Sequence, residues 1–255
     1  MRRFTWSYFA APPRFYRLAG QLVPWCAAIA VVLALWGLAI GLLIAPTVFQ
    51  LGDSYRIIFI HVPTAWMAMV LYVAMAFWAA VGMVFNARPA FMLAQAIAPT
   101  GAMMAFLALW TGALWGKPTW GAWWVWDARL TSTLILLFLY IGYMSLRAAI
   151  EDERRADRAS AVLAMVGVVN VPIIYFSVKW WNTLHQGASV SVTKSPTMAA
   201  IMLQGMLIMA LAAWAYSFAV VFVRVRHILL ERELGAAWTR EHLPQRSVPA
   251  GSVAT

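Results

Sequence analysis

Residues 22–45 decide the fold class, and they read LVPWCAAIAVVLALWGLAIGLLIA. This stretch carries no charged side chain and exceeds the roughly 20 apolar residues that a helix needs to cross a bilayer. The whole chain has the same character, since 64% of its 255 residues are hydrophobic and only 11% are charged. A soluble domain has about 25% charged residues. The sequence therefore predicts an all-α, polytopic membrane protein.

Five further apolar runs predict a bundle of six transmembrane helices joined by short loops. The six runs cover residues 22–45, 60–85, 90–114, 130–146, 159–178 and 198–223. The fourth run is the shortest, so its helix is expected to begin within the segment before it. Residues 1–21 are then an N-terminal segment, residues 22–223 the membrane domain and residues 224–255 a C-terminal tail. The first run is expected to be an uncleaved anchor, because no clear cleavage site follows it.

The basic residues predict that both termini lie in the cytoplasm. This orientation leaves all but five of the nineteen Lys and Arg residues on the cytoplasmic side, where membrane proteins carry such an excess. The five others are Arg56, Lys117, Arg129, Lys179 and Lys194. Residues 151–158 then form a cytoplasmic turn, and the outer loops are residues 46–59, 115–129 and 179–195. The net charge of +10 lies in short clusters between apolar runs, which favours membrane topology over nucleic-acid binding.

The middle outer loop is rich in tryptophan and reads WGKPTWGAWWVWDAR over residues 115–129. Tryptophan is common at membrane interfaces, so an aromatic belt is one interpretation. A belt has no need of Gly116, Gly121 or the Trp126–Asp127 pair, whereas rigid aromatic surfaces separated by glycines suit a large planar ligand. For Asp127, an ion pair with Arg129 and a cap on the fourth helix are two ordinary alternatives.

Two of the four histidines are predicted beside this loop, on the same side of the membrane. His61 lies at the mouth of the second run and His185 in the third outer loop, while His227 and His242 lie in the tail. Neutral imidazoles can supply both axial ligands of a haem iron. The basic residues of these loops would favour an anionic ligand, such as haem with its propionates. A zinc or copper centre would need three or four close ligands, which makes it a weaker match.

The runs themselves contain few polar groups. Gln95, Asn170 and Gln204 are expected to hold helices together, with a substrate path as the alternative. No charged residue lies inside the six runs, which argues against a proton-coupled pump. The single Cys26 excludes an internal disulfide and a thiolate metal cluster.

Three ordered blocks resemble the CcmC family of haem-handling proteins in bacterial cytochrome c maturation. Residues 115–129 resemble that family's WWD domain, residues 55–63 its first histidine block and residues 170–186 its second. The resemblance implies that haem b (iron-protoporphyrin IX) binds at the periplasmic face of the inner membrane, with His61 and His185 as axial ligands. The other residues expected to contact haem are Trp115, Gly116, Trp120, Trp123, Trp124, Trp126, Asp127, Arg56 and Arg129.

The resemblance also implies partners. The haem would be presented to the haem chaperone CcmE, together with the ATP-binding cassette pair CcmA and CcmB and the small membrane protein CcmD. This sequence has no P-loop pattern, so ATP hydrolysis would come from partners. The expected role is haem transfer rather than conventional enzyme catalysis. The alternatives are a membrane enzyme or electron carrier that retains its haem, and a small-molecule permease.

Overall fold

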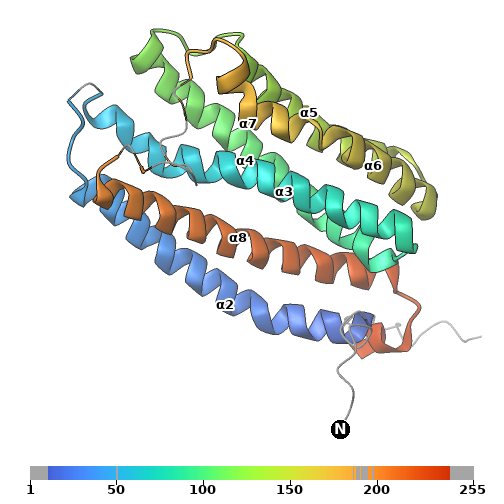
Figure 1. Ribbon diagram of the computed structural model, residues 1–255. Coiled ribbons are helices and arrows are strands. Elements are labelled where there is room, and N and C mark those ends of the chain that lie inside the picture. The colour runs from blue at the N-terminus through green and yellow to red at the C-terminus, as the bar shows by residue number, and fades with distance from the viewer. Residues whose placement is uncertain are drawn as a thin grey trace, which may run out of the picture.

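The computed structural model describes residues 11–49, 51–185, 187, 190, 195–196 and 198–241. Six helical stretches in this part are long and apolar enough to span a membrane. The described residues form no β-strand, apart from an isolated bridge between Val48 and Gly52. The prediction of an all-α, six-span membrane protein is therefore confirmed (Figure 1).

In the described residues, seven α-helices and three short helical turns build the six spans and their connections. The α-helices are α2 (Pro12–Ala39), α3 (Ile58–Phe85), α4 (Arg88–Trp120), α5 (Ala128–Ala149), α6 (Glu153–Gly167), α7 (Asn170–Trp180) and α8 (Ala200–Arg232). The short turns are the π-helix η1 (Ile40–Ile44) and the 3-10 helices η2 (Asp53–Ile57) and η3 (Ala237–Glu241). The first span joins α2 to η1, the second joins η2 to α3, and the fifth joins α6 to α7.

Four of the described residues determine where helices begin or end, through a left-handed backbone or a capping side chain. Asn86 ends α3 and Gly121 ends α4, and both adopt the left-handed conformation, with φ of 51° and 78°. Asp127 begins α5 and Asp152 begins α6, because each carboxylate accepts the backbone N–H three residues further on, at 2.7 and 2.8 Å. The fourth span accordingly starts at Ala128, within the segment before the apolar run, as predicted.

Several boundaries differ from those that the apolar runs predict. Helix α4 continues to Trp120, so residues 115–120 are helical rather than part of a loop; only Gly121 stops the helix. Helix α6 begins at Glu153, which reduces the predicted turn at 151–158 to three residues. Helix α8 extends to Arg232 without interruption, because no Gly or Pro occurs between Gly205 and Gly235.

The fifth span consists of two helices instead of one. Helix α6 ends at Gly167 and α7 begins at Asn170. Pro172 explains the break, because its ring clashes with the carbonyl four residues earlier and it has no N–H to donate.

The helices pack as three groups, which Figure 1 shows side by side. Helix α2 lies along α8, α3 lies along α4 in the centre, and α5, α6 and α7 cover the opposite side. Tyr140 is fully buried between these groups, and its hydroxyl donates to the carbonyl of Ala68 at 2.8 Å. Two of the polar residues noted above hold helices together. Gln95 accepts from Arg232 at 2.8 Å, and Asn170 donates to the carbonyl of Ser132 at 2.9 Å.

The bundle has two chemically different ends. We call the end formed by residues 45–49, 51–57, 121–127, 181–185, 195–196 and 198–199 the histidine end. The opposite end, formed by residues 86–87, 150–152 and 233–241 together with the adjoining turns of the helices, is called the arginine end. Both ends of the described chain lie at the arginine end, since the Tyr16 ring on α2 contacts the Trp238 ring on η3 at 5.5 Å.

Candidate functional site

His61 and His185 come together at the histidine end, as the sequence predicts. Their ring centroids lie 6.2 Å apart, with 35° between the ring planes. Two tryptophans from the last turns of α4 flank the pair. Trp115 lies edge-on to His61 at 5.8 Å, and Trp120 lies 6.4 Å from His185. We call these four side chains the histidine–tryptophan cluster.

A hydrogen bond to Thr111 fixes the orientation of His61. The Nδ1 atom of His61 lies 3.1 Å from the Thr111 hydroxyl oxygen. That hydroxyl donates its single proton to the carbonyl of Leu107 at 2.6 Å, so its oxygen accepts from Nδ1–H of His61. The Nε2 atom then carries the lone pair, which is the arrangement that a metal-binding imidazole requires.

Thr111 and the neighbouring Gly112 are residues that the sequence reasoning missed. A Cβ at Gly112 would lie 3.1 Å from Cε1 of His61, so glycine allows the ring to approach α4 closely. A signal was available, because Thr111 lies four residues before Trp115 and therefore on the same helix face.

Asp127 and Thr183 hold the backbone at His185. One carboxylate oxygen of Asp127 caps α5, and the other accepts a short hydrogen bond from the Thr183 hydroxyl. The Thr183 oxygen in turn accepts the backbone N–H of His185 at 3.0 Å. Of the two alternatives for Asp127, the helix cap is thus observed. Thr183 was not singled out from the sequence, although it lies only two residues before His185.

The remaining tryptophans of the segment differ in exposure. Trp123 and Trp126 are 55% and 78% exposed, and Trp124 packs edge-on against Trp126 at 5.4 Å. Gly116 is buried, and a Cβ there would come within 3.1 Å of the Trp120 ring and of the carbonyl of residue 122. Glycine at this position therefore lets the segment fold back against the end of α4.

Two indole N–H groups at the histidine end are buried and have no acceptor among the described residues. They belong to Trp115 and Trp124. An unsatisfied buried donor costs about 1–3 kcal/mol. Both groups therefore favour a ligand that brings hydrogen-bond acceptors, such as the propionates of a porphyrin.

The two predicted arginines have different surroundings. Arg129 donates to the carbonyl of Ile174 at 2.8 Å, and its positive charge acts on the His61 ring. Arg56 pairs with Asp53 at 2.8 Å and donates to the carbonyl of Gly41 at 2.6 Å. Arg129 is therefore the better placed of the two to meet an anionic ligand beside His61. Lys194 and His242 lie outside the described residues.

The pair of histidines limits the kind of metal that can bind. Within the described ranges, no group of three or more His, Cys, Asp or Glu side chains could hold a metal ion. A metal bound between His61 and His185 must therefore bring further ligands, as the iron of a porphyrin does. Two imidazoles that bind one metal from opposite sides at about 2 Å leave their ring centroids about 6 Å apart. The observed separation of 6.2 Å fits that arrangement.

Comparisons with known proteins agree on one family. The family model described as heme exporter protein C matches residues 5–240. The chain is 43% identical to the heme exporter protein C of Escherichia coli strain K12, over 95% of this chain and 98% of that protein. It is 45% identical to the Bradyrhizobium diazoefficiens protein of that name, over 88% and 83% of the two chains. For the Paracoccus denitrificans protein of that name, the identity is 37% over 93% and 98%.

Proposed function

Because the chain belongs to the heme exporter protein C family, we propose that it binds haem between His61 and His185 and presents it for cytochrome c maturation. One observation carries the proposal, namely the 6.2 Å separation of two imidazoles that come from different parts of the fold. Haem supplies four in-plane nitrogens, so two histidines complete the coordination of its iron. The haem is cargo, since the protein would release it to a partner.

The proposed site gives a role to most of the predicted residues. His61 and His185 bind the iron, while Trp115 and Trp120 lie against the ring and exclude water. The buried N–H groups of Trp115 and Trp124 are available to the propionates, and Arg129 adds positive charge beside His61. Asp127 acts indirectly, through Thr183 and the backbone of His185.

The site faces the periplasm in this proposal. The arginine end carries most of the basic side chains, and cytoplasmic segments of membrane proteins carry such an excess. Both termini then lie in the cytoplasm, and the histidine end lies at the periplasmic surface of the inner membrane. A periplasmic haem chaperone of the CcmE type would dock against the exposed Trp123 and Trp126. Subunits of the CcmA, CcmB and CcmD type would complete the complex.

Absorption spectra of the purified, haem-loaded protein test the axial ligands. Two imidazoles give a strong axial field, so the wild-type protein should be six-coordinate and low-spin. His61→Gly or His185→Gly should shift the spectrum toward high spin and weaken haem retention, and added imidazole should restore part of the low-spin signal. Trp120→Ala removes contact area but no ligand, so its remaining haem should stay low-spin. His227→Ala is the control, because this exposed side chain lies on α8 near the arginine end.

Two outcomes would contradict the proposal. If both histidine variants keep the wild-type spectrum and haem content, the two imidazoles are not the ligands. If the protein keeps its haem in the presence of an excess of apo-chaperone and the ABC subunits, haem is a resident cofactor. The electron-carrier alternative would then replace haem presentation.

A further inference from the structure

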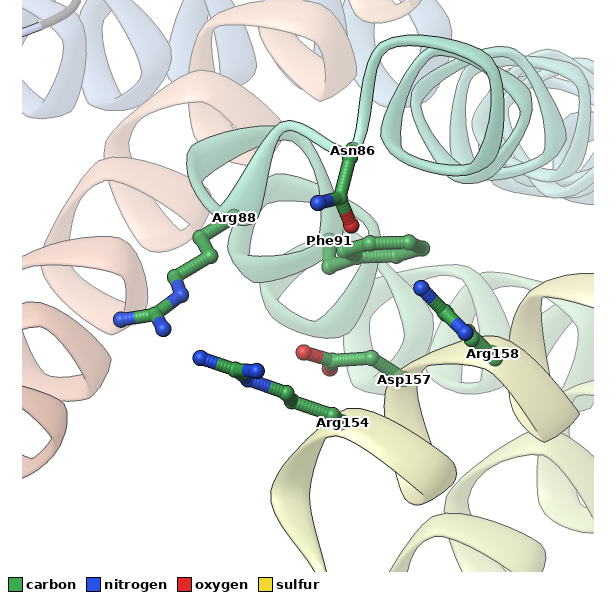
Figure 2. A pocket seen from close by; sticks show the side chains of 6 residues that line it. All are labelled: Asn86, Arg88, Phe91, Arg154, Asp157 and Arg158. Atoms are coloured by element: carbon green, nitrogen blue, oxygen red, sulfur yellow. The ribbon is translucent and has the colours of Figure 1, made fainter.

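A cavity at the arginine end lies on the opposite side of the bundle from the histidine–tryptophan cluster. It has a volume of about 110 Å³ and lies between the α3–α4 turn and the first turns of α6. Its lining residues are Asn86, Arg88, Phe91, Arg154, Asp157 and Arg158. Figure 2 shows Arg88 from α4 and Arg154 from α6 reaching toward the same opening, with Asp157 between Arg154 and Arg158. We call it the arginine pocket.

The acidic residue of the arginine pocket, Asp157, already pairs with arginines that do not line the pocket. Asp157 is buried, and its carboxylate forms a short ion pair with Arg147 and two hydrogen bonds with Arg232, at 2.9 and 3.0 Å. Glu153 also pairs with Arg147 and Arg232, at 2.9 and 3.1 Å. Glu153 and Asp157 thus both pair with two arginines that do not line the pocket.

Arg88, Arg154 and Arg158 accordingly remain available to a ligand. Within the described part of the chain, none of the three makes an ion pair or a hydrogen bond. Three guanidinium groups around one opening repel one another, and an anion placed among them would relieve that repulsion. Guanidinium matches phosphate geometry through paired N–H donors. The pocket therefore favours a phosphate group.

The position of the pocket indicates where the phosphate comes from. Helix α4 has 33 residues, so at 1.5 Å per residue it is about 50 Å long and reaches through the headgroup layer of a bilayer about 40–45 Å thick. Its first residue, Arg88, thus lies near the headgroups. Immediately beside the pocket, Val84 and Phe85 at the end of α3 are 75% and 74% exposed. A ligand with a phosphate head and an apolar body would contact both surfaces.

We propose that the arginine pocket binds the phosphate of an anionic phospholipid headgroup, with Arg88, Arg154 and Arg158 as its ligands. This site is independent of the haem proposal, because it shares no residue with the histidine–tryptophan cluster. A lipid bound there would contact both the α3–α4 turn and the start of α6, which are far apart in the sequence. The lipid would thereby stabilise the arginine end of the bundle.

Thermal unfolding of the full chain in a neutral detergent tests this proposal. Short-chain phosphatidylglycerol should raise the Tm in a concentration-dependent way, because a ligand that binds only the folded state stabilises it. Phosphatidylcholine and inorganic phosphate should have little effect at equal concentration. Arg154→Gln and Arg88→Gln should each weaken phosphatidylglycerol binding about tenfold or more, since each removes a charge-assisted hydrogen bond. Without lipid, both variants should unfold near the wild-type Tm, because these side chains hold no other group.

Arg155→Gln is the matched control. It lies next to Arg154 on α6 and is exposed, but it does not line the pocket. It should change lipid binding by less than about twofold, because a charge beyond direct contact is screened. Equal losses for Arg155→Gln and Arg154→Gln would mean that binding follows surface charge alone, and would overturn the site. If inorganic phosphate raises the Tm as much as phosphatidylglycerol does, the ligand is a free anion and the lipid proposal is wrong.

Discussion

Thr111 links the chemistry of His61 to the packing of α3 against α4. Its hydroxyl donates to its own helix and accepts from the imidazole, so one small side chain decides which ring nitrogen carries the proton. The groups that orient metal-binding histidines typically change metal affinity 10–100-fold when they are removed.

Replacing Thr111 should therefore weaken haem binding without removing a ligand. Thr111→Val keeps the shape of the side chain but cannot accept from Nδ1, and we expect about 10–100-fold weaker haem binding. Thr111→Ser should restore binding, because it returns the hydroxyl. Haem titration of the purified protein measures both effects. Thr133→Val is the control, since Thr133 makes the same kind of intrahelical bond on α5. Wild-type affinity in Thr111→Val would show that His61 needs no such partner.

Asp127 has two structural roles, and either one would explain an aspartate at this position. It caps α5, as many aspartates do, and it also accepts from Thr183. The second contact connects the tryptophan-rich segment with the loop that carries His185. Two hydrogen bonds thus connect the segments, one from the Thr183 hydroxyl to Asp127 and one from the backbone N–H of His185 to Thr183.

At the scale of the helices, close packing in the core depends on small residues. A Cβ at Gly101 on α4 would overlap the ring of Tyr140 on α5, whose hydroxyl is bound to α3. Gly101 therefore lets three helices meet at one point. Gly142 on α5 differs, because a Cβ there would lie 3.5 Å from Leu163, which is an ordinary contact.

The two glycines should respond in opposite ways to the same substitution. Gly101→Ala should destabilise the fold by about 1–3 kcal/mol, the usual cost of overpacking. Gly142→Ala should be neutral or stabilising by up to about 1 kcal/mol, because alanine is the better helix former. Thermal unfolding in detergent compares them. A similar loss of stability in both variants would mean that helix α5 needs its glycine for flexibility and that packing is not the cause.

The sequence predicted the helices better than it predicted their ends. Apolar runs locate the six spans because a bilayer demands about 20 apolar residues in each. The runs cannot reveal that α4 continues to Trp120, because tryptophan and lysine weaken an apolar pattern without stopping a helix, and Pro118 lies inside the last turn of α4. The end at Gly121 depends on a left-handed backbone conformation. The split of the fifth span is different, since Pro172 is a helix-breaking residue within the run but the apolar pattern continues across it.

At the scale of the whole molecule, rare residue types were easier to predict than common ones. His61, His185 and the tryptophans were identified because few side chains bind metal or planar rings. Thr111 and Thr183 are ordinary residues, and they matter only because packing brings α4 to α3 and α5 to the His185 loop. Likewise, counting arginines predicts orientation, but the count does not separate Arg147, which is paired, from Arg154, which is not.

The orientation of the whole bundle can be tested because the chain has one cysteine, Cys26. In a Cys26→Ala background, Ser195→Cys labels the histidine end and Glu151→Cys labels the arginine end, and both positions are exposed. An impermeant maleimide should modify Ser195→Cys in intact spheroplasts and Glu151→Cys only after lysis, because basic residues favour the cytoplasmic side. The reverse pattern would move the histidine–tryptophan cluster to the cytoplasm, where it could not present haem to a periplasmic chaperone.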